Sequence, residues 1–364
     1  MVLRWDLDKT YLVSHFESLR YLLRVPFQRA EDKVSVPGVA ALIKGIRRTL
    51  DRRGIGVRVY FLSASPPQIG GAIRDKLTLD GIDYDAIVFK DQFRNLIKAR
   101  FDAVLEHIGY KLERLLQGAL QADAGSLELL FGDDWESDPF IYSLYADVVE
   151  GRVDVERLAR IVEVAGVNRD DARQIVSLAR ELRHDARVET IFILRQRPAS
   201  PQDLLAFGSR LVWFDNYFEC SLKLFEIGML NAESVLGVLA DAGLSPAAAA
   251  ESFDAVCGRD PASRACLSRL RRILLRAKLM DHVDSAPLGR RIRAALRRVL
   301  ARRRWSRVLA RRQWSRVLAG RRWPRTVPVV PDYEQLVTRW SYRRRKEVLH
   351  AVESKPHPGV DDRG

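Results

Sequence analysis

The chain has 364 residues, of which 47% are hydrophobic and 30% are charged, and its formal net charge at pH 7 is +14. This length allows about two domains, with a core large enough to need neither a disulfide framework nor a structural metal. No stretch approaches the roughly 18 uninterrupted apolar residues of a transmembrane helix, and Cys220, Cys257 and Cys266 have no metal-ligand spacing, so we expect a soluble cytoplasmic protein.

The first predicted strand covers residues 1 to 10, an apolar run that carries Asp6 and Asp8. Alternate side chains of an extended segment point to the same side, so both carboxylates point the same way and Leu7 points into the core. Two such close carboxylates repel each other unless one is protonated or a cation lies between them. The pair suits a nucleophile, a neighbouring acid/base and a hard metal ion, although a polar strand end turning into a loop has the same pattern.

Three further apolar runs predict strands, and polar residues follow them. After a connector over residues 11 to 37, the run over 57 to 62 ends in Ser63, the run over 86 to 89 ends in Lys90, and the run over 127 to 131 leads into Asp133. Helices are predicted at residues 38 to 53, 67 to 79, 92 to 120 and 138 to 149. This alternation predicts an α/β fold with a doubly wound parallel sheet, which binds ligands at the carboxyl ends of its strands.

The order of these motifs resembles a known superfamily. Asp6-x-Asp8-x-Thr10, a strand ending in Ser63, a lysine, and a strand leading into Gly132-Asp133-x-x-x-x-Asp138 together resemble the haloacid dehalogenase (HAD) superfamily of aspartyl phosphotransferases. The segments Phe61-Leu-Ser-Ala-Ser-Pro66 and Ile141-Tyr142 are similar to the catalytic domain of the actin-patch-associated phosphatidate phosphatases, distant relatives of the lipins. The resemblance covers roughly residues 1 to 150 and implies a Rossmann-like HAD fold with a mainly helical C-terminal extension.

The resemblance implies a role for each motif residue. Asp6 is expected to be the nucleophile that forms an aspartyl-phosphate, and Asp8 the acid/base that protonates the leaving alkoxide and later activates water. Ser63 is expected to hold a phosphoryl oxygen, and Lys111 to offset the negative charge of the intermediate. Mg²⁺ is the expected cofactor, and its expected ligands are Asp6, the backbone carbonyl of Asp8, Asp133 and, as a further ligand or support, Asp138.

Some of these assignments have neighbouring alternatives. Asp134 is the alternative to Asp133 as a metal ligand, and Ser65 is the alternative to Ser63. Lys90 and Lys98 are the alternatives to Lys111. Lys9 stands where the phosphatidate phosphatases usually carry an acid and many HAD enzymes carry glycine. This departure leaves the catalytic pair in place and the identity of the substrate open.

Beyond residue 150 the pattern changes. Residues 154 to 184 predict one or two helices, residues 188 to 194 a fifth strand, and residues 201 to 280 a helical unit. Four aromatic residues fall on one face of a predicted helix, where they suit either core packing or a wall facing the substrate: Trp213, Phe214, Tyr217 and Phe218. We predict four parts: a HAD-like domain over 1–195, a helical unit over 196–285, an Arg/Trp-rich tail over 286–330, and a short helix with a frayed end over 331–364.

The positive charge is concentrated in one segment of the predicted tail. Residues 290 to 325 contain fifteen arginines and no acid, which exceeds the net charge of the whole chain. A nine-residue unit ending in Trp305, Trp314 and Trp323 is repeated there, and nine residues are two and a half helical turns, so successive tryptophans would lie on opposite sides of a helix. The segment suits either a solvated extension or the binding of a polyanion, which is anionic lipid or nucleic acid.

The resemblance and the charge pattern together predict a Mg²⁺-dependent phosphomonoester hydrolase. Its leading substrate is phosphatidate or a related phospholipid, and the basic segment would place the enzyme at the periphery of an anionic membrane. One alternative is a polynucleotide end phosphatase that uses the basic segment to hold nucleic acid. Another is a non-catalytic binding module whose basic segment is the functional part.

Overall fold

The computed structural model describes residues 1–13, 33–63, 67–89, 102–135, 137–196, 201–280 and 330–339. The chain divides into two compact units. Unit 1 comprises Met1–Phe93, Gly125–Pro139 and Arg187–Val329, and unit 2 comprises Arg94–Ala124, Phe140–Ala186 and Val330–Gly364. The nonapeptide repeat lies outside the described residues, as do Ser65, Lys90 and Lys98.

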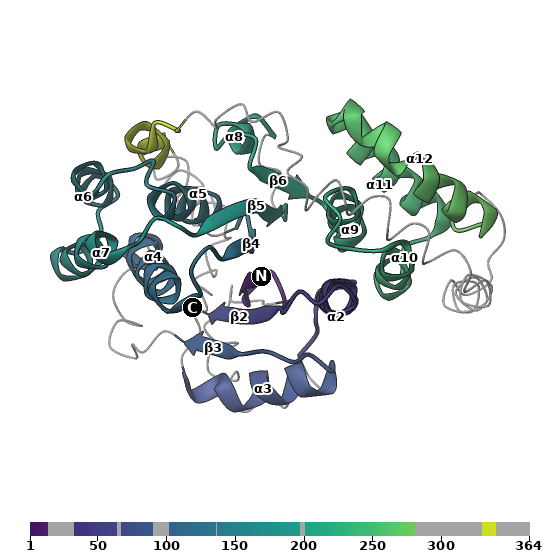
Figure 1. Cartoon of the computed structure of the whole chain (residues 1–364), viewed down its shortest axis with the longest axis horizontal. Coiled ribbons are helices and arrows are strands. Elements are labelled where there is room, and N and C mark those ends of the chain that lie inside the picture. The colour runs from purple at the N-terminus through teal and green to yellow at the C-terminus, as the bar shows by residue number, and fades with distance from the viewer. Residues whose placement is uncertain are drawn as a thin grey trace, which may run out of the picture. The chain divides into compact units, whose positions relative to one another are not determined.

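Six parallel strands form one sheet in the described part of unit 1, in the order β3-β2-β1-β4-β5-β6 (Figure 1). The strands are β1 (Val2–Asp6), β2 (Arg58–Ser63), β3 (Ala86–Phe89), β4 (Leu127–Asp133), β5 (Arg187–Leu194) and β6 (Leu211–Phe214). The chain starts in the middle at β1, winds outward to β3, and then crosses to β4 and winds outward to β6. This is a Rossmann-like doubly wound order, and it confirms the predicted α/β class with a parallel sheet.

Contacts on both faces of the sheet align β1 with its neighbour β4. Trp5, Phe131 and Phe192 occupy equivalent positions on β1, β4 and β5, and their rings stack with centroid distances of 3.7 Å for Trp5–Phe131 and 5.0 Å for Phe131–Phe192. On the other face, Arg4 of β1 makes two hydrogen bonds of 2.8 Å to the carboxylate of Glu128 on β4. Both charged side chains are buried, so each offsets part of the cost of burying the other.

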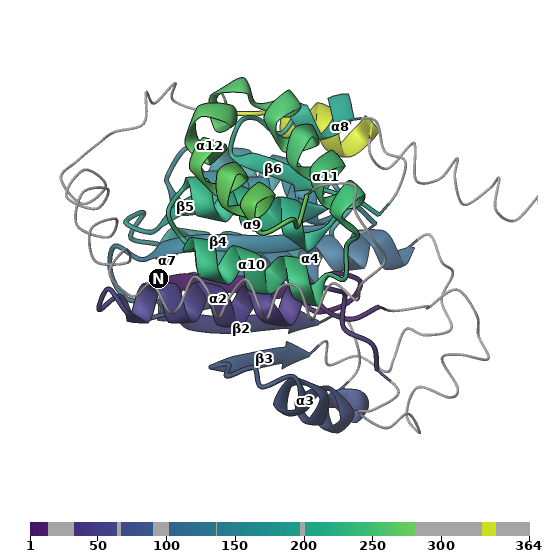
Figure 2. The same cartoon turned by 90° about the vertical axis from the view of Figure 1, so that its right-hand side faces the viewer.

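Helices of unit 1 cover the face of the sheet that carries Trp5. Figure 2 shows α2 (Val39–Asp51), α10 (Ala232–Asp241) and α9 (Tyr217–Glu226) in front of the strands. The apolar spacing that predicts a helix over residues 38 to 53 produces the buried face of α2, and its residues join Trp5 in one core. The other helices in the described part of this unit are the 3-10 helix η3 (Pro67–Ile69), α3 (Gly70–Leu79), α8 (Pro201–Leu205), α11 (Pro246–Arg259) and α12 (Pro261–Arg276).

The strand β6 corrects the sequence analysis, which predicts only helices over residues 201 to 280. A run of four apolar residues is too short to show a helical or a strand period, and pairing with β5 decides its structure. The four aromatic residues therefore do not share one helical face, because Trp213 lies on β6 whereas Tyr217 begins α9. Three of the four belong to the buried core, which favours the packing interpretation: Phe214, Tyr217 and Phe218.

Asp80, at the end of α3, fastens the segment that follows β1. Its carboxylate accepts hydrogen bonds from the hydroxyls of Tyr11 and Ser35 and from the ammonium of Lys76, the last at 2.7 Å. Burial acts to raise the pKa of Asp80, but the three hydrogen bonds and the charge of Lys76 outweigh it and lower that pKa below its ordinary value. The ionised carboxylate is therefore the form that the fold stabilises.

The described part of unit 2 is helical. It contains α4 (Asp102–Gln121), α5 (Asp138–Val149, whose first two residues belong to unit 1), α6 (Val155–Val164), α7 (Arg169–Glu181) and a short helix over residues 333 to 339. The short helix is anchored by Tyr333, which is fully buried, packs edge-on against Phe140 and donates a 2.6 Å hydrogen bond to Asp147. Among the described residues, no helix combines the length and the apolar character needed to cross a membrane.

Candidate active site

The strand order reverses between β1 and β4, and this reversal positions three acids. From β1 the chain continues to one side of the sheet, and from β4 it continues to the other side. Sheets of this kind bind ligands outside the carboxyl ends of the strands at this switch point. Asp6 is the last residue of β1, Asp133 is the last residue of β4, and Asp138 is the first residue of α5.

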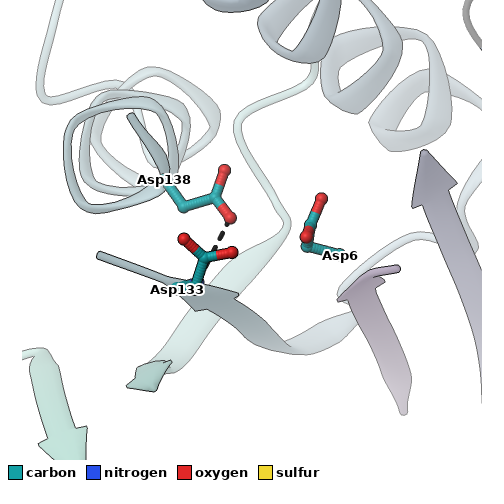
Figure 3. A group of neighbouring side chains, drawn as sticks. All are labelled: Asp6, Asp133 and Asp138. Atoms are coloured by element: carbon teal, nitrogen blue, oxygen red, sulfur yellow. Dashed lines mark hydrogen bonds between the residues drawn. The ribbon is translucent and has the colours of Figure 1, made fainter. Parts of the chain in front are cut away.

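Asp6, Asp133 and Asp138 form a buried trio of carboxylates (Figure 3). One oxygen from each lies within 4.8 Å of the others, and all three side chains are fully buried. Burying several carboxylates together is costly unless positive charge or hydrogen-bond donors accompany them. Carboxylate oxygens in this number are the ligands that hard divalent cations such as Mg²⁺ prefer, so the trio fits such an ion.

Hydrogen bonds hold the trio in place. The Thr10 hydroxyl lies 3.2 Å from Asp6 Oδ2 and 3.3 Å from Asp133 Oδ2, so its single proton serves two carboxylates. Asp133 Oδ1 accepts a 2.6 Å hydrogen bond from the backbone N–H of Trp135, and the backbone N–H of Asp133 donates to Asp138 Oδ2 at 3.3 Å. Asp6 and Asp133 therefore take their orientation from the loops that follow β1 and β4, and Asp138 takes its orientation from the end of β4.

Asp8 and Ser63 form a polar pair that is separate from the trio. Ser63 is the last residue of β2, and its hydroxyl donates a 2.8 Å hydrogen bond to Asp8 Oδ2, with both side chains buried. The side chain of Asp8 is not a member of the trio, and the contribution to a metal that the sequence predicts for Asp8 is its backbone carbonyl. The pairing with Ser63 holds the Asp8 carboxyl in one position.

Asp134, the alternative to Asp133, has a different set of contacts. Its Oδ1 accepts a 2.7 Å hydrogen bond from the backbone N–H of Gln196, just after β5, and it lies outside the trio. The side-chain amide of Gln196 in turn donates to the backbone carbonyl of Lys9. The ammonium of Lys9 lies 3.8 Å from the ring centroid of Trp135. These contacts join the loops that follow β1, β4 and β5.

Tyr217 also supports the site, and the sequence analysis did not predict this role. Its hydroxyl, on α9, donates a 2.6 Å hydrogen bond to the backbone carbonyl of Thr10. Burial above all, with the nearby Cys220, Asp133 and Asp6, raises the pKa of Tyr217 well above its ordinary value, so the hydroxyl keeps its proton. Tyr217 is 207 residues from Thr10, and no local pattern links them.

Two further supporting residues did carry a signal in the sequence. Thr10 lies four residues after Asp6, within the motif itself. Gln196 follows the predicted fifth strand, whose carboxyl end belongs to the edge where ligands bind. Thr10 and Gln196 could therefore have been proposed as supports of the site from the positions alone.

Lys111 belongs to unit 2, where it lies on α4 and is fully buried. Its role toward Asp6 stays a prediction. The choice between Lys111 and either Lys90 or Lys98 also stays open, because those two lysines lie outside the described residues.

No family model, no curated protein and no solved structure matches the chain. The chemistry of the site is therefore inferred from its own residues. They offer a buried carboxylate at the end of β1 in Asp6, a second carboxyl group held by a hydroxyl in Asp8, and a trio of oxygens suited to a hard cation.

Proposed function

We propose that the chain is a Mg²⁺-dependent phosphomonoester hydrolase of the HAD type, which forms an aspartyl-phosphate on Asp6. The observation that carries the proposal is the buried trio of Asp6, Asp133 and Asp138 at the carboxyl ends of β1 and β4. Carboxylates in this number are the ligands that a hard divalent cation prefers, and a cation beside a carboxylate nucleophile is suited to phosphoryl transfer. The order of the motifs, which resembles that of the HAD superfamily, supports the same proposal.

In the first step, a carboxylate oxygen of Asp6 attacks the phosphorus of the bound monoester. The new P–O bond to Asp6 forms as the P–O bond to the leaving group breaks, and Asp8 gives its proton to the leaving oxygen. Ser63 has a single hydroxyl proton, which it donates to Asp8 in the described structure. To hold a phosphoryl oxygen, Ser63 must turn this proton away from Asp8, so the two contacts alternate.

In the second step, water attacks the phosphorus of the aspartyl-phosphate. The carboxylate of Asp8 takes a proton from this water, the P–O bond to Asp6 breaks, and inorganic phosphate and the original Asp6 are released. Asp6, Asp133 and Asp138 would hold Mg²⁺, which when bound offsets the negative charge of the phosphoryl group. Lys111 is the proposed second source of positive charge.

The test is a phosphate-release screen over lipid, nucleotide, sugar and polynucleotide monoesters, with Mg²⁺ and with a chelator. We expect release from at least one class that requires Mg²⁺, and its loss in Asp6→Asn with the circular dichroism spectrum unchanged. Asp133→Ala should lower the Mg²⁺-dependent activity more than Asp134→Ala does, and Asp134→Ala is the matched control because it changes the next residue in the chain. An unchanged rate in Asp6→Asn removes the nucleophile assignment, and equal effects of the two alanine variants mean that the wrong acid is assigned to the metal.

For the substrate we propose a phospholipid monoester, of which phosphatidate is the simplest. The fifteen arginines over residues 290 to 325 would bring the enzyme to an anionic surface, where each nearby basic residue contributes on the order of 1 kcal/mol. A polynucleotide end is the rival, because the same arginines would bind phosphates and the tryptophans would stack on unpaired bases. Release from neither lipid nor any other monoester would favour a non-catalytic binding module.

A further inference from the structure

Lys9 is the cation nearest in sequence to the catalytic acids, because it lies between Asp8 and Thr10. Its φ of 62° is in the left-handed region, where an L residue is strained and glycine is not. A lysine therefore occupies a turn position that glycine would fill without strain. A side chain retained at such a cost points to a use for its charge.

Two contacts join Lys9 to the loops that follow β4 and β5. Its Nζ lies over the ring of Trp135, 3.8 Å from the centroid, and the backbone N–H of Trp135 is bonded to Asp133. The backbone carbonyl of Lys9 is bonded to the side chain of Gln196. An aromatic face holds an ammonium in position without neutralising its charge. Lys9 and Trp135 are both partly exposed, so solutes can reach them.

We propose that Lys9, seated on Trp135, binds a second anionic group of the substrate beside the phosphoryl group that Asp6 attacks. This inference rests on the proposed function and narrows its substrate class to phosphomonoesters whose leaving group carries a further phosphate or carboxylate. An oxygen of that group accepts a charge-assisted hydrogen bond from the ammonium. Among the phospholipid monoesters of the proposed function, this inference excludes phosphatidate, because its diacylglycerol leaving group is neutral. Monoesters with a neighbouring phosphodiester or carboxylate are inside the class.

The test compares two phosphonates that differ in one group. Propylphosphonate and 3-phosphonopropionate have the same phosphonate and the same carbon spacer, but the second carries a carboxylate in place of a methyl group. Binding of each to the full chain is measured by calorimetry with Mg²⁺ present. We expect 3-phosphonopropionate to bind about tenfold or more tightly than propylphosphonate, the contribution of one hydrogen bond between charged groups. Neither compound needs to be hydrolysed.

Three variants assign the preference to Lys9. In Lys9→Gly the ratio of the two affinities should fall to about one, and in Lys9→Arg, which keeps a cation over Trp135, it should persist. Lys278→Gly is the matched control: Lys278 has a φ of 56° at the end of α12 and is exposed, so the substitution removes the same charge and relieves the same backbone strain elsewhere. The ratio of the two affinities in Lys278→Gly should equal the ratio in the unchanged chain.

The outcomes separate this inference from the proposed function. A preference for 3-phosphonopropionate that is lost in Lys9→Gly supports the inference even if no ester is hydrolysed, in which case the proposed function fails alone. Hydrolysis of esters without any preference between the phosphonates overturns the inference alone. The inference is also overturned if the chain binds neither phosphonate. It is overturned as well if Lys9→Gly loses the same affinity for both compounds, because Lys9 then only offsets the charge of the acids.

Discussion

Asp138→Asn tests whether the buried acids are a repulsive cluster that a cation relieves. Two unit charges 4.8 Å apart repel each other by about 3.5 kcal/mol at an effective dielectric constant of about 20. Asp138 faces two such neighbours, Asp6 and Asp133, when all three are ionised. Asparagine keeps an oxygen that accepts the backbone hydrogen bond of Asp133, so the substitution removes the charge and preserves this contact.

The expected gain in stability has an upper limit. A carboxyl group escapes repulsion by taking up a proton, which costs about 4 kcal/mol at pH 7 for an ordinary aspartate. We therefore expect Asp138→Asn to raise the free energy of unfolding by about 1 to 3 kcal/mol in chelator. Mg²⁺ at a hundred times its Kd stabilises the unchanged chain by about 2.7 kcal/mol, and a variant with a weaker site gains less. The advantage of the variant should therefore shrink or reverse in Mg²⁺.

The assay is urea unfolding followed by circular dichroism, in chelator and in Mg²⁺. Asp134→Asn is the control, because Asp134 is outside the trio and asparagine can still accept its hydrogen bond from Gln196. We expect a smaller effect in this control, and the same effect in both conditions. A loss of stability in chelator for Asp138→Asn, or a gain that Mg²⁺ does not change, would refute the interpretation of the trio as a cation site.

Three further predictions concern the rest of the molecule. The pKa of Asp80 is lowered on folding, so its contribution to stability is present above about pH 4 and is lost as the pH falls through the lowered value. The difference in unfolding free energy between the unchanged chain and Asp80→Asn should therefore become smaller below about pH 4. Gly109→Ala should lower the unfolding free energy by about 1 to 3 kcal/mol, because the added carbon would lie 2.9 Å from Val167, whereas Gly237→Ala, with nothing within 4 Å, should raise it by up to about 1 kcal/mol. Replacing residues 286–325 by a Gly/Ser linker should abolish sedimentation with anionic vesicles at low salt and leave the Tyr333 anchor in place. If the replacement abolishes only the binding of single-stranded nucleic acid, the polynucleotide substrate is favoured. If neither vesicle sedimentation nor nucleic-acid binding changes, both substrate proposals are contradicted.

Several helices and strands were predictable from the apolar pattern of the sequence. The helix predicted over residues 138 to 149 has these bounds in the structure, and the strand predicted over 86 to 89 also has its predicted bounds. The strand β6 was not predicted, although its apolar run is as long as that of β3, because Trp213 and Phe214 were assigned to one helical face with Tyr217 and Phe218. Pairing with the preceding strand β5 makes the run a strand. The sequence pattern therefore predicts an element only where local interactions determine its structure.

The site was predictable to the extent that strand ends determine it. The carboxyl-end rule is enough to bring Asp6 and Asp133 together once β1 and β4 are recognised as parallel strands. The supports of these acids come from elsewhere: Tyr217 reaches Thr10 across 207 residues, and only the packing of α9 against the sheet creates that contact. The roles of the acids in catalysis stay predictions until activity is measured.

The central place of β1 determines the order in which the sheet can be completed during synthesis. β1 is made before both of its neighbours and can pair with β2 once residue 63 is made, but its other edge stays unpaired until β4 is made. At about 5 to 20 residues per second, the 65 residues from Ser63 to Glu128 take roughly 3 to 13 seconds. Over that interval Arg4 lacks its carboxylate and Trp5 lacks its stacking partner. The nascent chain then carries an unpaired strand edge beside Asp6, and an edge of this kind favours misassembly.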